Sequence, residues 1–510
     1  MKMTWFGLKA GVTSPVRTPQ PLKSILVQVC AFIPALLVSA QSFNQIKSFP
    51  GIAFDPSTGA YTNSGGAYPQ AQLTLAGATL YGTTPAAGSS GSGTIFKINT
   101  DGSDFVVLRN FAAGALNSAT QQFTNSDGQQ PQSKLLVSGG TVFGAATFGG
   151  TLGNGTLFKV GTNGAGFTVL RTFANGPSDG ANPHGNLVLT SAGTLYGTTE
   201  LGGTGGAGIV YRIDTNGDHF AIAHHFDYSQ ANGAMPMAGL ILSGSTLYGT
   251  TYAGGSSGWG TIFRFDTTVS TFAVLKSFPA PNPLDLSGTN SGGYHPQAQL
   301  ELSEGLLYGT TAYGGASSNG TVFVITTNGT GFAVLHNFSA LLPYPFGLGT
   351  NSDGANSSGN PVVLGNKLYG TTQHGGETGS GTIFKLNTNG SNFSVIRHFS
   401  QNNGGGGVPA AGLLLSGATF YGSTQFGGQA SAGTLFGLAV PGPQLTITRA
   451  GTNVILSWPS DDLGFTLQSN PNLGPLTIWN PVFPLPVVVN NRYTVTNAAS
   501  DAACFYRLGQ

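Results

Sequence analysis

Between residues 187 and 226, four short runs of β-branched, aromatic and other apolar residues alternate with stretches of Gly, Asn, Ser and Asp. The runs cover residues 187–189, 194–199, 208–213 and 220–226. Runs of this length and composition, bounded by turn residues, predict β-strands. No stretch after residue 40 carries a convincing apolar period of about 3.6 residues, so the pattern predicts an all-β protein.

This unit of four runs occurs seven times. Its second run contains a Tyr-Gly or Phe-Gly pair, whose glycines are Gly82, Gly144, Gly197, Gly249, Gly309, Gly370 and Gly422. Successive glycines lie 52–62 residues apart, in the range where a repeat indicates a propeller or a solenoid. A single four-stranded sheet cannot bury both of its faces, and radial repetition of such sheets produces the blades of a β-propeller.

The two ends of the repeat array indicate how the ring closes. The pattern of the fourth run, Phe-x-x-x-basic-x-Phe, also occurs before the first unit, over residues 43–49. The seventh unit stops after its third run, at residues 433–438. We therefore expect the N-terminal strand to complete the last blade, which removes two open sheet edges. The prediction is a seven-bladed β-propeller over residues 41–438.

Residues 1–40 have the features of a secretory signal peptide. They contain four basic residues, an apolar run over residues 25–38 and a cleavage site of small residues that ends at Ala40. A membrane anchor is the alternative, although the run is short for a membrane span. Cleavage removes four basic and no acidic residues from the nineteen and eighteen of the whole chain, which leaves a net charge of −3. That balance gives no reason to expect nucleic acid or an anionic membrane as a partner.

The repeat pattern ends at a linker, residues 439–443, which is rich in proline and glycine. Beyond it, strands are predicted at residues 444–448, 453–458, 465–469, 492–496 and 505–508. The segments Val-Ile-Leu-Ser-Trp-Pro and Phe-Thr-Leu-Gln in this region resemble the early strands of a fibronectin type III-like sandwich. We therefore expect residues 444–510 to form a small C-terminal β domain. One cysteine, Cys504, follows residue 40, so that region has no pair for an intrachain disulfide.

Three spaced motifs recur in the units: Leu-Tyr-Gly-Thr-Thr, Gly-Thr-Ile-Phe and Thr-Asn-Gly-x-x-Phe. In these motifs the chain resembles the GloVer (Gloeobacter/Verrucomicrobia-type) tandem repeat of exported bacterial proteins, over roughly residues 43–438. The resemblance implies an extracytoplasmic location and no assigned activity. Anchored members carry a C-terminal hydrophobic span with a basic tail, and this chain shows none. A looser resemblance is to kelch propellers, although Phe stands where kelch repeats carry Trp.

Two local motifs resemble ligand-binding loops, but the sequence around each of them argues against that function. Residues 203–208 match the Gly-x-Gly-x-x-Gly spacing of dinucleotide-binding loops, which need a helix after them, whereas a strand is predicted here. Residues 214–218 resemble the start of a calcium loop, but the glycine comes too early and no glutamate follows at position twelve. A hairpin turn centred on Asn-Gly, with positive φ at both residues, is the favoured interpretation.

One basic position recurs in all seven fourth strands. It is occupied by Lys47, Arg109, Arg171, His224, Lys276, His336 and Arg397. A basic belt for an acidic ligand is one interpretation. The favoured one is that these side chains lie on exposed outer edges, where charge blocks pairing with another sheet.

No catalytic constellation stands out in the sequence. Glycosidases need two converging carboxyl groups, and serine hydrolases need a base beside the nucleophile. The eighteen acidic residues are scattered, so we assign no catalytic residue, no cofactor and no metal site. The sequence favours an exported, non-enzymatic scaffold for binding or surface structure. The alternative is a propeller-type carbohydrate-active enzyme, a glycosidase or lyase, because the Thr-Asn-Gly-x-x-Phe turn is similar to a turn of sialidase-like propellers.

The candidate binding residues lie in the loops between second and third strands. These loops and the connectors between units are expected to emerge on one face, and loops on a rigid scaffold often carry function. The variable positions there are Phe148, Glu200, Tyr252, Trp259, Tyr313, His374 and Phe426. Aromatic rings among uncharged polar groups suit a glycan or a peptide or protein ligand. We expect a monomer, secreted or held in the periplasm or at the cell surface, with no transmembrane anchor in the mature chain.

Overall fold

The computed structural model describes residues 42–509 except 58, 231, 284–287, 344–348, 402–403, 441–443, 460–464, 472–478, 491 and 499–503. The signal peptide expected at residues 1–40 lies outside this range. Every regular element assigned within it is a β-strand, and no helix there is long and apolar enough to cross a membrane. The all-β expectation is confirmed for this part of the chain.

Seven four-stranded antiparallel sheets follow one another between residues 43 and 439, and we number them 1 to 7 in chain order. Sheet 1 contains β4 (Thr74–Ala76), β5 (Thr79–Thr84), β6 (Thr94–Asn99) and β7 (Val106–Asn110). Sheet 2 contains β10 (Leu136–Ser138), β11 (Thr141–Ala146), β12 (Thr156–Gly161) and β13 (Thr168–Thr172). Sheet 3 contains β15 (Val188–Leu189), β16 (Thr194–Thr199), β18 (Ile209–Asp214) and β19 (Ala221–His225).

The remaining four sheets have the same strand order. Sheet 4 contains β21 (Ile241–Ser243), β22 (Thr246–Thr251), β24 (Thr261–Asp266) and β25 (Thr271–Ser277). Sheet 5 contains β26 (Glu301–Ser303), β27 (Leu306–Thr311), β28 (Thr321–Thr326) and β29 (Ala333–Asn337). Sheet 6 contains β30 (Val362–Leu364), β31 (Lys367–Thr372), β32 (Thr382–Asn387) and β33 (Ser394–His398). Sheet 7 contains β34 (Leu414–Ser416), β35 (Thr419–Thr424), β36 (Thr434–Ala439) and β1 (Phe43–Ser48).

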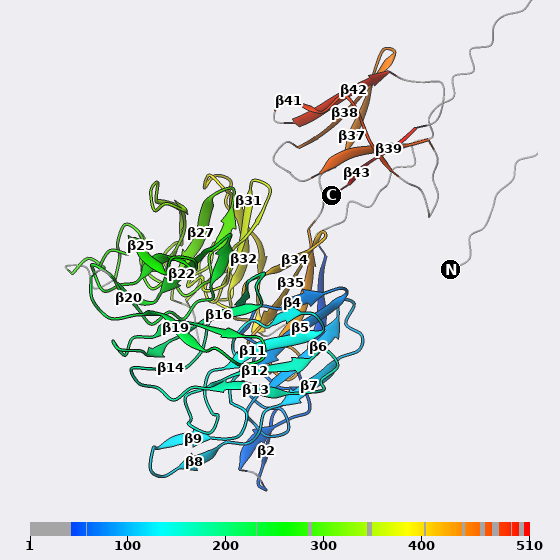
Figure 1. The fold of residues 1–510 in the computed structure, drawn as a ribbon. Coiled ribbons are helices and arrows are strands. Elements are labelled where there is room, and N and C mark those ends of the chain that lie inside the picture. Colours follow the sequence, from blue (N-terminus) through cyan, green and yellow to red (C-terminus); the bar gives the residue numbers. More distant parts are fainter. Residues whose placement is uncertain are drawn as a thin grey trace, which may run out of the picture.

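Strand β1 supplies the fourth strand of sheet 7 by pairing antiparallel with β36, so that Phe43 lies opposite Leu438 and Ser48 opposite Thr434. This is the pairing that the sequence predicts. Figure 1 shows the blue strands β4 and β5 beside the orange strands β34 and β35, so the two ends of the array meet. The architecture is that of a β-propeller-like ring.

Neighbouring sheets pack through apolar clusters, one at each of the seven junctions that the described residues form. At the junction of sheets 7 and 1, the fully buried Phe49 ring meets Phe96 edge-on with centroids 5.5 Å apart. The Phe96 ring in turn covers Gly82, where an added Cβ would lie 2.5 Å from Phe96 Cζ. The repeated glycine of the Tyr-Gly pairs is therefore needed because the aromatic ring of the third strand occupies the space of a side chain.

The recurring basic position also belongs to these junctions. Each side chain lies against the phenylalanine ring of the next sheet, in the pairs Lys47–Phe105, Arg109–Phe167, Arg171–Phe220, His224–Phe272, Lys276–Phe332, His336–Phe393 and Arg397–Phe43. Arg171 Cζ is 3.4 Å from the centroid of Phe220, and the imidazole of His336 stacks at 3.7 Å on Phe393. The expectation that these side chains stay exposed to block edge pairing is wrong, because cation–π attraction and stacking bind them to the neighbouring sheet.

The turn between third and fourth strands also differs from the expected type. At residues 214–218 the N–H of Gly217 donates to Asp214 O at 2.9 Å, and the N–H of Asp214 donates to Asp218 O at 3.0 Å. Gly217 has a φ of +99°, whereas Asn216 is not among the residues with positive φ. This is a type I turn with a glycine bulge rather than a type I′ turn. The segment with calcium-loop spacing is thus a hairpin turn, and the dinucleotide-like segment directly precedes β18.

Four small two-stranded sheets add to the connectors. They are β2 (Ala53–Asp55) with β3 (Ala60–Thr62), β8 (Ala115–Asn117) with β9 (Gln122–Thr124), β14 (Gly180–Ala181) with β17 (Leu201–Gly202), and β20 (Gly233–Ala234) with β23 (Ala253–Gly254). Figure 1 shows β2, β8 and β9 projecting together from one side of the ring.

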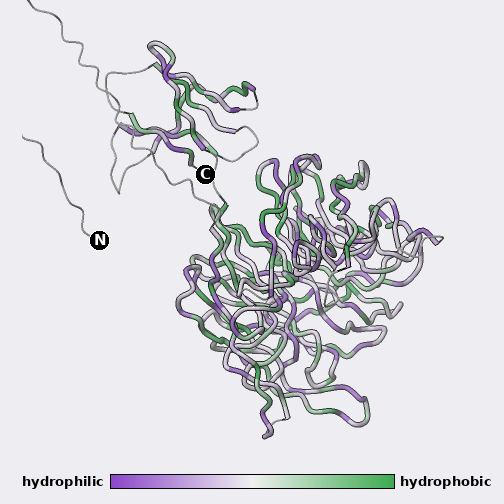
Figure 2. Tube along the Cα trace, turned by 180° about the vertical axis from the view of Figure 1, so that it is seen from behind, coloured by the Kyte–Doolittle hydropathy of each residue, from purple (hydrophilic) through white to green (hydrophobic). Residues whose placement is uncertain are grey.

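The C-terminal region forms two further sheets. One contains β37 (Thr446–Ala450), β38 (Asn453–Pro459), β42 (Arg492–Ala498) and β41 (Val487–Val489), and the other contains β40 (Asn480–Pro481), β39 (Thr466–Asn470) and β43 (Phe505–Gly509). Its core holds Leu456, Trp458, Leu467 and Val495. Figure 2 shows the apolar strand β41 in green at the rim of this unit, where all three valines are exposed.

Candidate functional site

The loops between second and third strands lie beside the connectors between sheets at all seven junctions. Backbone bridges join them as Ala67–Ala86, Gln129–Phe148, β14–β17, β20–β23, Tyr294–Tyr313, Ala355–His374 and Gly407–Phe426. The two loop classes therefore share one face, as the sequence predicts.

Hydroxyl groups at the strand ends hold these loops in position. Thr311, the second threonine of Tyr-Gly-Thr-Thr, donates from Oγ1 to Tyr313 O at 3.1 Å and also bonds Thr321 Oγ1 at 3.0 Å. Thr372 and Thr424 make the same contact with the carbonyl groups of His374 and Phe426. Because this framework is repeated, the side chain at the loop position can vary while its backbone stays fixed.

Five rings gather at the junction of sheets 4 and 5, and we call them the aromatic cluster. They are Tyr252, Trp259, Tyr294, His295 and Tyr313. Tyr252 and Trp259 come from the loop of sheet 4, Tyr294 and His295 from the connector, and Tyr313 from the loop of sheet 5. Three of the seven predicted site residues thus meet in one place.

The cluster is held rigidly by its own contacts. The imidazole of His295 stacks on Tyr252 with centroids 3.9 Å apart and an interplanar angle of 3°, and its Nδ1–H donates to Tyr252 O at 2.7 Å. The Trp259 ring lies 5.0 Å from both Tyr294 and His295, and Tyr294 stacks on Tyr313 at 5.8 Å. The N–H of His295 donates to Trp259 O at 3.1 Å, which joins the loop of sheet 4 to the connector.

The cluster carries no charge at neutral pH. Burial lowers the pKa of His295, so its imidazole is neutral there. Burial also raises the pKa of Tyr252, and the neighbouring phenols of Tyr313 and Tyr294 raise it further. Tyr313 is 39 % exposed, so an aromatic face remains open to solvent. Such a surface offers stacking and neutral hydrogen bonds rather than ionic recognition.

The other four predicted residues lie apart, each at its own junction. Phe148 is 37 % exposed, and Phe426 packs on Tyr68 with centroids 5.4 Å apart. Glu200 Oε2 lies 3.2 Å from Nε2 of His184, and burial lowers the pKa of His374.

Sequence reasoning missed Tyr294 and His295, the two connector members of the cluster. The available signal was their position immediately before Pro296. A proline recurs at this point in six connectors, and the residue before it adopts positive φ in each of them, as Tyr68 and Met235 do. The N–H of that residue bonds the preceding sheet's loop, so its side chain lies beside the variable loop positions.

The centre of the ring is closed by polar side chains. Asn360 Nδ2 donates to Gln72 Oε1 at 3.2 Å and to Gln299 Oε1 at 3.1 Å, and Asn186 Nδ2 donates to Gln299 Oε1 at 3.0 Å. The cavity above them has a volume of about 210 Å³ and no Asp or Glu among its lining residues. Among the residues that the structure describes, no group of three or more His, Cys, Asp or Glu side chains could hold a metal ion.

Comparison with known proteins supports the repeat assignment. The Gloeobacter/Verrucomicrobia repeat model matches residues 113–288, about a third of the chain. No curated protein matches the sequence. The likeness to kelch repeats finds no support in these matches.

Several solved structures resemble the chain at low similarity. An oligogalacturonate lyase in complex with manganese is 11% identical with a TM-score of 0.43, over 79% of this chain and 96% of that one. A putative 6-phosphogluconolactonase from Bacteroides uniformis ATCC 8492 is 13% identical with a TM-score of 0.40, over 68% and 90%. A nidogen/laminin complex is 14% identical with a TM-score of 0.34, over 53% and 81%.

Proposed function

We propose that this chain is an exported, non-enzymatic binding protein that takes an uncharged glycan or peptide on its aromatic cluster. Its scaffold is a seven-bladed β-propeller over residues 41–438, closed by β1. A linker at residues 439–443 joins it to a small fibronectin type III-like domain at residues 444–510. The protein acts outside the cytoplasm as a monomer, after removal of residues 1–40.

The convergence of Tyr252, Trp259 and Tyr313 with Tyr294 and His295 carries this proposal. Five rings from three separate segments form a neutral surface that backbone hydrogen bonds fix in place. Preorganised rings bind flat, apolar faces with little loss of side-chain entropy, and neighbouring polar groups set the orientation. Two cavities, of about 210 and 700 Å³, have no Asp or Glu among their lining residues, which favours binding over glycoside cleavage there.

Arrays of neutral glycans and peptides test the proposal with the variant Trp259→Ala/Tyr313→Ala. We expect this variant to lose at least about ten-fold in affinity, since two ring contacts are removed. Phe148→Ala is the matched control, because Phe148 holds the same loop position in sheet 2 and is similarly exposed, at 37 % against 39 % for Tyr313. Equal binding by wild type and the double variant, with both folded, would contradict the site.

An enzymatic role is tested on the same protein. Wild type is incubated without added metal with glycans, esters and phosphoesters, and products are analysed by chromatography. If wild type converts a substrate and Trp259→Ala/Tyr313→Ala does not, the aromatic cluster is a catalytic site and the non-enzymatic proposal is wrong.

A further inference from the structure

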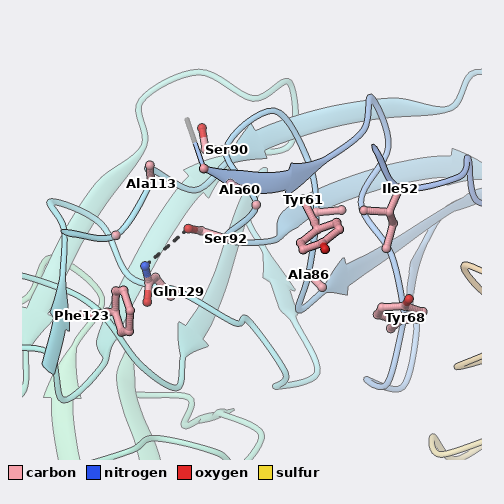
Figure 3. A pocket seen from close by; sticks show the side chains of 14 residues that line it. Ile52, Ala60, Tyr61, Tyr68, Ala86, Ser90, Ser92, Ala113, Phe123 and Gln129 are labelled. Atoms are coloured by element: carbon pink, nitrogen blue, oxygen red, sulfur yellow. Dashed lines mark hydrogen bonds between the residues drawn. The ribbon is translucent and has the colours of Figure 1, made fainter. Parts of the chain in front are cut away.

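A second cavity, of about 700 Å³, lies between the two projecting hairpins, away from the aromatic cluster. The β2–β3 hairpin forms one wall and the β8–β9 hairpin the other. Figure 3 shows Tyr61 and Phe123 on these walls, with Ser90, Ser92 and Gln129 between them and Tyr68 on the far side of Tyr61. A cavity of this size lies in the range of small-molecule sites, roughly 300–1,000 Å³.

Both walls are fixed at their bases by an asparagine. Asn63 Nδ2 donates to Pro50 O at 2.8 Å and to Gly66 O at 3.1 Å, and it closes the connector that carries β2–β3. Asn125 Nδ2 does the same for β8–β9 through Ala112 O at 2.8 Å and Gly128 O at 2.7 Å. The opening between the hairpins is therefore a preformed feature of the fold.

The hairpins also rest on the loops of their sheets. Ala60 of β3 packs on Gly91, where an added Cβ would lie 2.9 Å from Ala60 Cβ. Gln122 of β9 donates from Nε2 to Asn154 Oδ1 at 3.1 Å. Each wall is thus held both at its base and along its length.

Large aromatic rings on these walls face solvent. Tyr61 is 65 % exposed and Phe123 is 56 % exposed, although rings of this size normally gain free energy by burial. Exposed aromatic side chains beside a cavity mark a binding surface more often than scattered single ones do.

The chemistry of the lining defines the ligand class. None of the fourteen lining residues is Asp, Glu, Lys, Arg or His, so the cavity offers no partner for a phosphate, a carboxylate or a cation. It offers aromatic faces together with the hydroxyl groups of Ser90 and Ser92 and the amide of Gln129, whose Nε2 lies 3.5 Å from Ser92 Oγ. Apolar C–H faces ringed by neutral hydroxyl groups, the surface of a hexose or pentose, complement that set.

We propose that this cavity is a binding site for a neutral oligosaccharide, separate from the aromatic cluster. A peptide that binds by adding a strand fits less well, because that mode needs a free strand edge to pair with the ligand backbone. Here the loop at Gly91 lies directly beside Tyr61 of β3, with its Cβ position 3.3 Å from Tyr61 O.

Isothermal titration with neutral hexasaccharides of glucose, xylose and mannose tests this site. We expect wild type to bind at least one of them and Tyr61→Ala/Phe123→Ala to lose about ten-fold or more in affinity. Tyr228→Ala and Leu116→Ala are matched controls, since these side chains are 60 % and 55 % exposed and line neither cavity, and Leu116 lies in the same hairpin as Phe123. Both controls should stay within about two-fold of wild type.

The same titrations distinguish this site from the aromatic cluster. Trp259→Ala/Tyr313→Ala should bind the hexasaccharide at the hairpin cavity with unchanged affinity, whatever its behaviour on the arrays. No heat of binding by wild type at about 5 mM sugar would overturn the proposal. An equal loss in Leu116→Ala, or tighter binding of a neutral hexapeptide than of any sugar, would also overturn it.

Discussion

Gly370 illustrates how single residues determine this fold. Its backbone lies against the ring of Phe384 in the next strand, so the site has no room for a side chain, although its φ is not in the positive range. The same contact recurs in the other sheets, which is why one glycine persists while the loops around it change.

Substitution of Gly370 by alanine should therefore destabilise the protein through crowding alone. The added Cβ would meet Phe384 Cζ at 2.5 Å, and overpacking of this kind costs about 1–3 kcal/mol. Urea unfolding followed by tryptophan fluorescence measures the change. Gly437→Ala is the control, because its Cβ would have its nearest neighbour, Ile46 Cδ1, at 3.5 Å, and the free energy of unfolding should change by less than about 0.5 kcal/mol. Equal losses in the two variants would contradict the crowding argument.

At the scale of strands and turns, the sequence predicts much of what the structure shows. The four runs of each unit become four strands because apolar residues at those positions fill the clusters between sheets, and β1 pairs with β36. The exceptions depend on contacts between segments far apart in the chain. Nothing in the sequence indicates that Arg171 contacts Phe220. The prediction that Arg171 is an exposed edge charge was therefore wrong.

The two projecting hairpins and strand β41 were not predicted. The side chains of all three are largely exposed, and β41 has only three residues, all valine, so none of them shows the alternation of apolar and polar residues that marks a strand with one buried face. The connectors that precede sheets 1, 2, 5 and 6 share one sequence feature, a Thr-Asn-Ser motif. Its asparagines, Asn63, Asn125, Asn290 and Asn351, donate to two carbonyl groups each and close the connector bases.

The candidate site was predicted in part. Tyr252, Trp259 and Tyr313 stood out because they vary within a constant framework. These three side chains meet each other, and not Phe148 or Phe426, because of how sheets 4 and 5 pack at their junction. The spacing of the motifs along the chain carries no information on that packing.

The inner strands β26 and β30 are joined by a partly buried carboxyl group, and this predicts a pH dependence. Glu301 of β26 accepts a hydrogen bond from the N–H of Val363 in β30, and burial raises its pKa above the ordinary 4.5, although Val363 and Lys134 oppose the shift. The folded protein therefore holds this proton more tightly than the unfolded chain does. Its contribution to stability is complete below pH 4.5 and is lost as the pH rises through the folded pKa.

The variant Glu301→Gln tests this dependence. Melting temperatures are measured across the acidic range for wild type and variant, and the difference between them isolates this group. We expect wild type to lose stability relative to Glu301→Gln as the pH rises above 4.5. A difference that stays constant with pH would contradict the shift. Glu304→Gln, in the exposed turn that follows β26, is the control.

At the scale of the whole molecule, β1 completes the ring. A chain that begins at residue 50 lacks Phe49, whose ring is 1% exposed, and leaves the edge of β36 unpaired. Loss of buried phenylalanine alone costs about 3–5 kcal/mol, and an open edge promotes association between copies. We expect a lower melting temperature and oligomers in light scattering.

A chain that begins at residue 41 is the control for this truncation, because it keeps β1. A synthetic peptide of residues 41–49, added to the shorter chain, should raise its melting temperature by restoring the pairing with β36. Identical melting of the two chains would show that the ring does not depend on β1.

The pairing of β1 with β36 also sets the order in which the protein can fold. The two partners lie almost 400 residues apart, so the first strand to be synthesised finds its place last. Contacts of such sequence separation make folding slow, because the chain must close its largest loop before they form. Sheets 1 to 6 can each form earlier, because their strands are adjacent in the sequence. The final step of folding is thus the joining of the two ends of the ring, and forced or thermal unfolding should begin at the junction of β1 and β36.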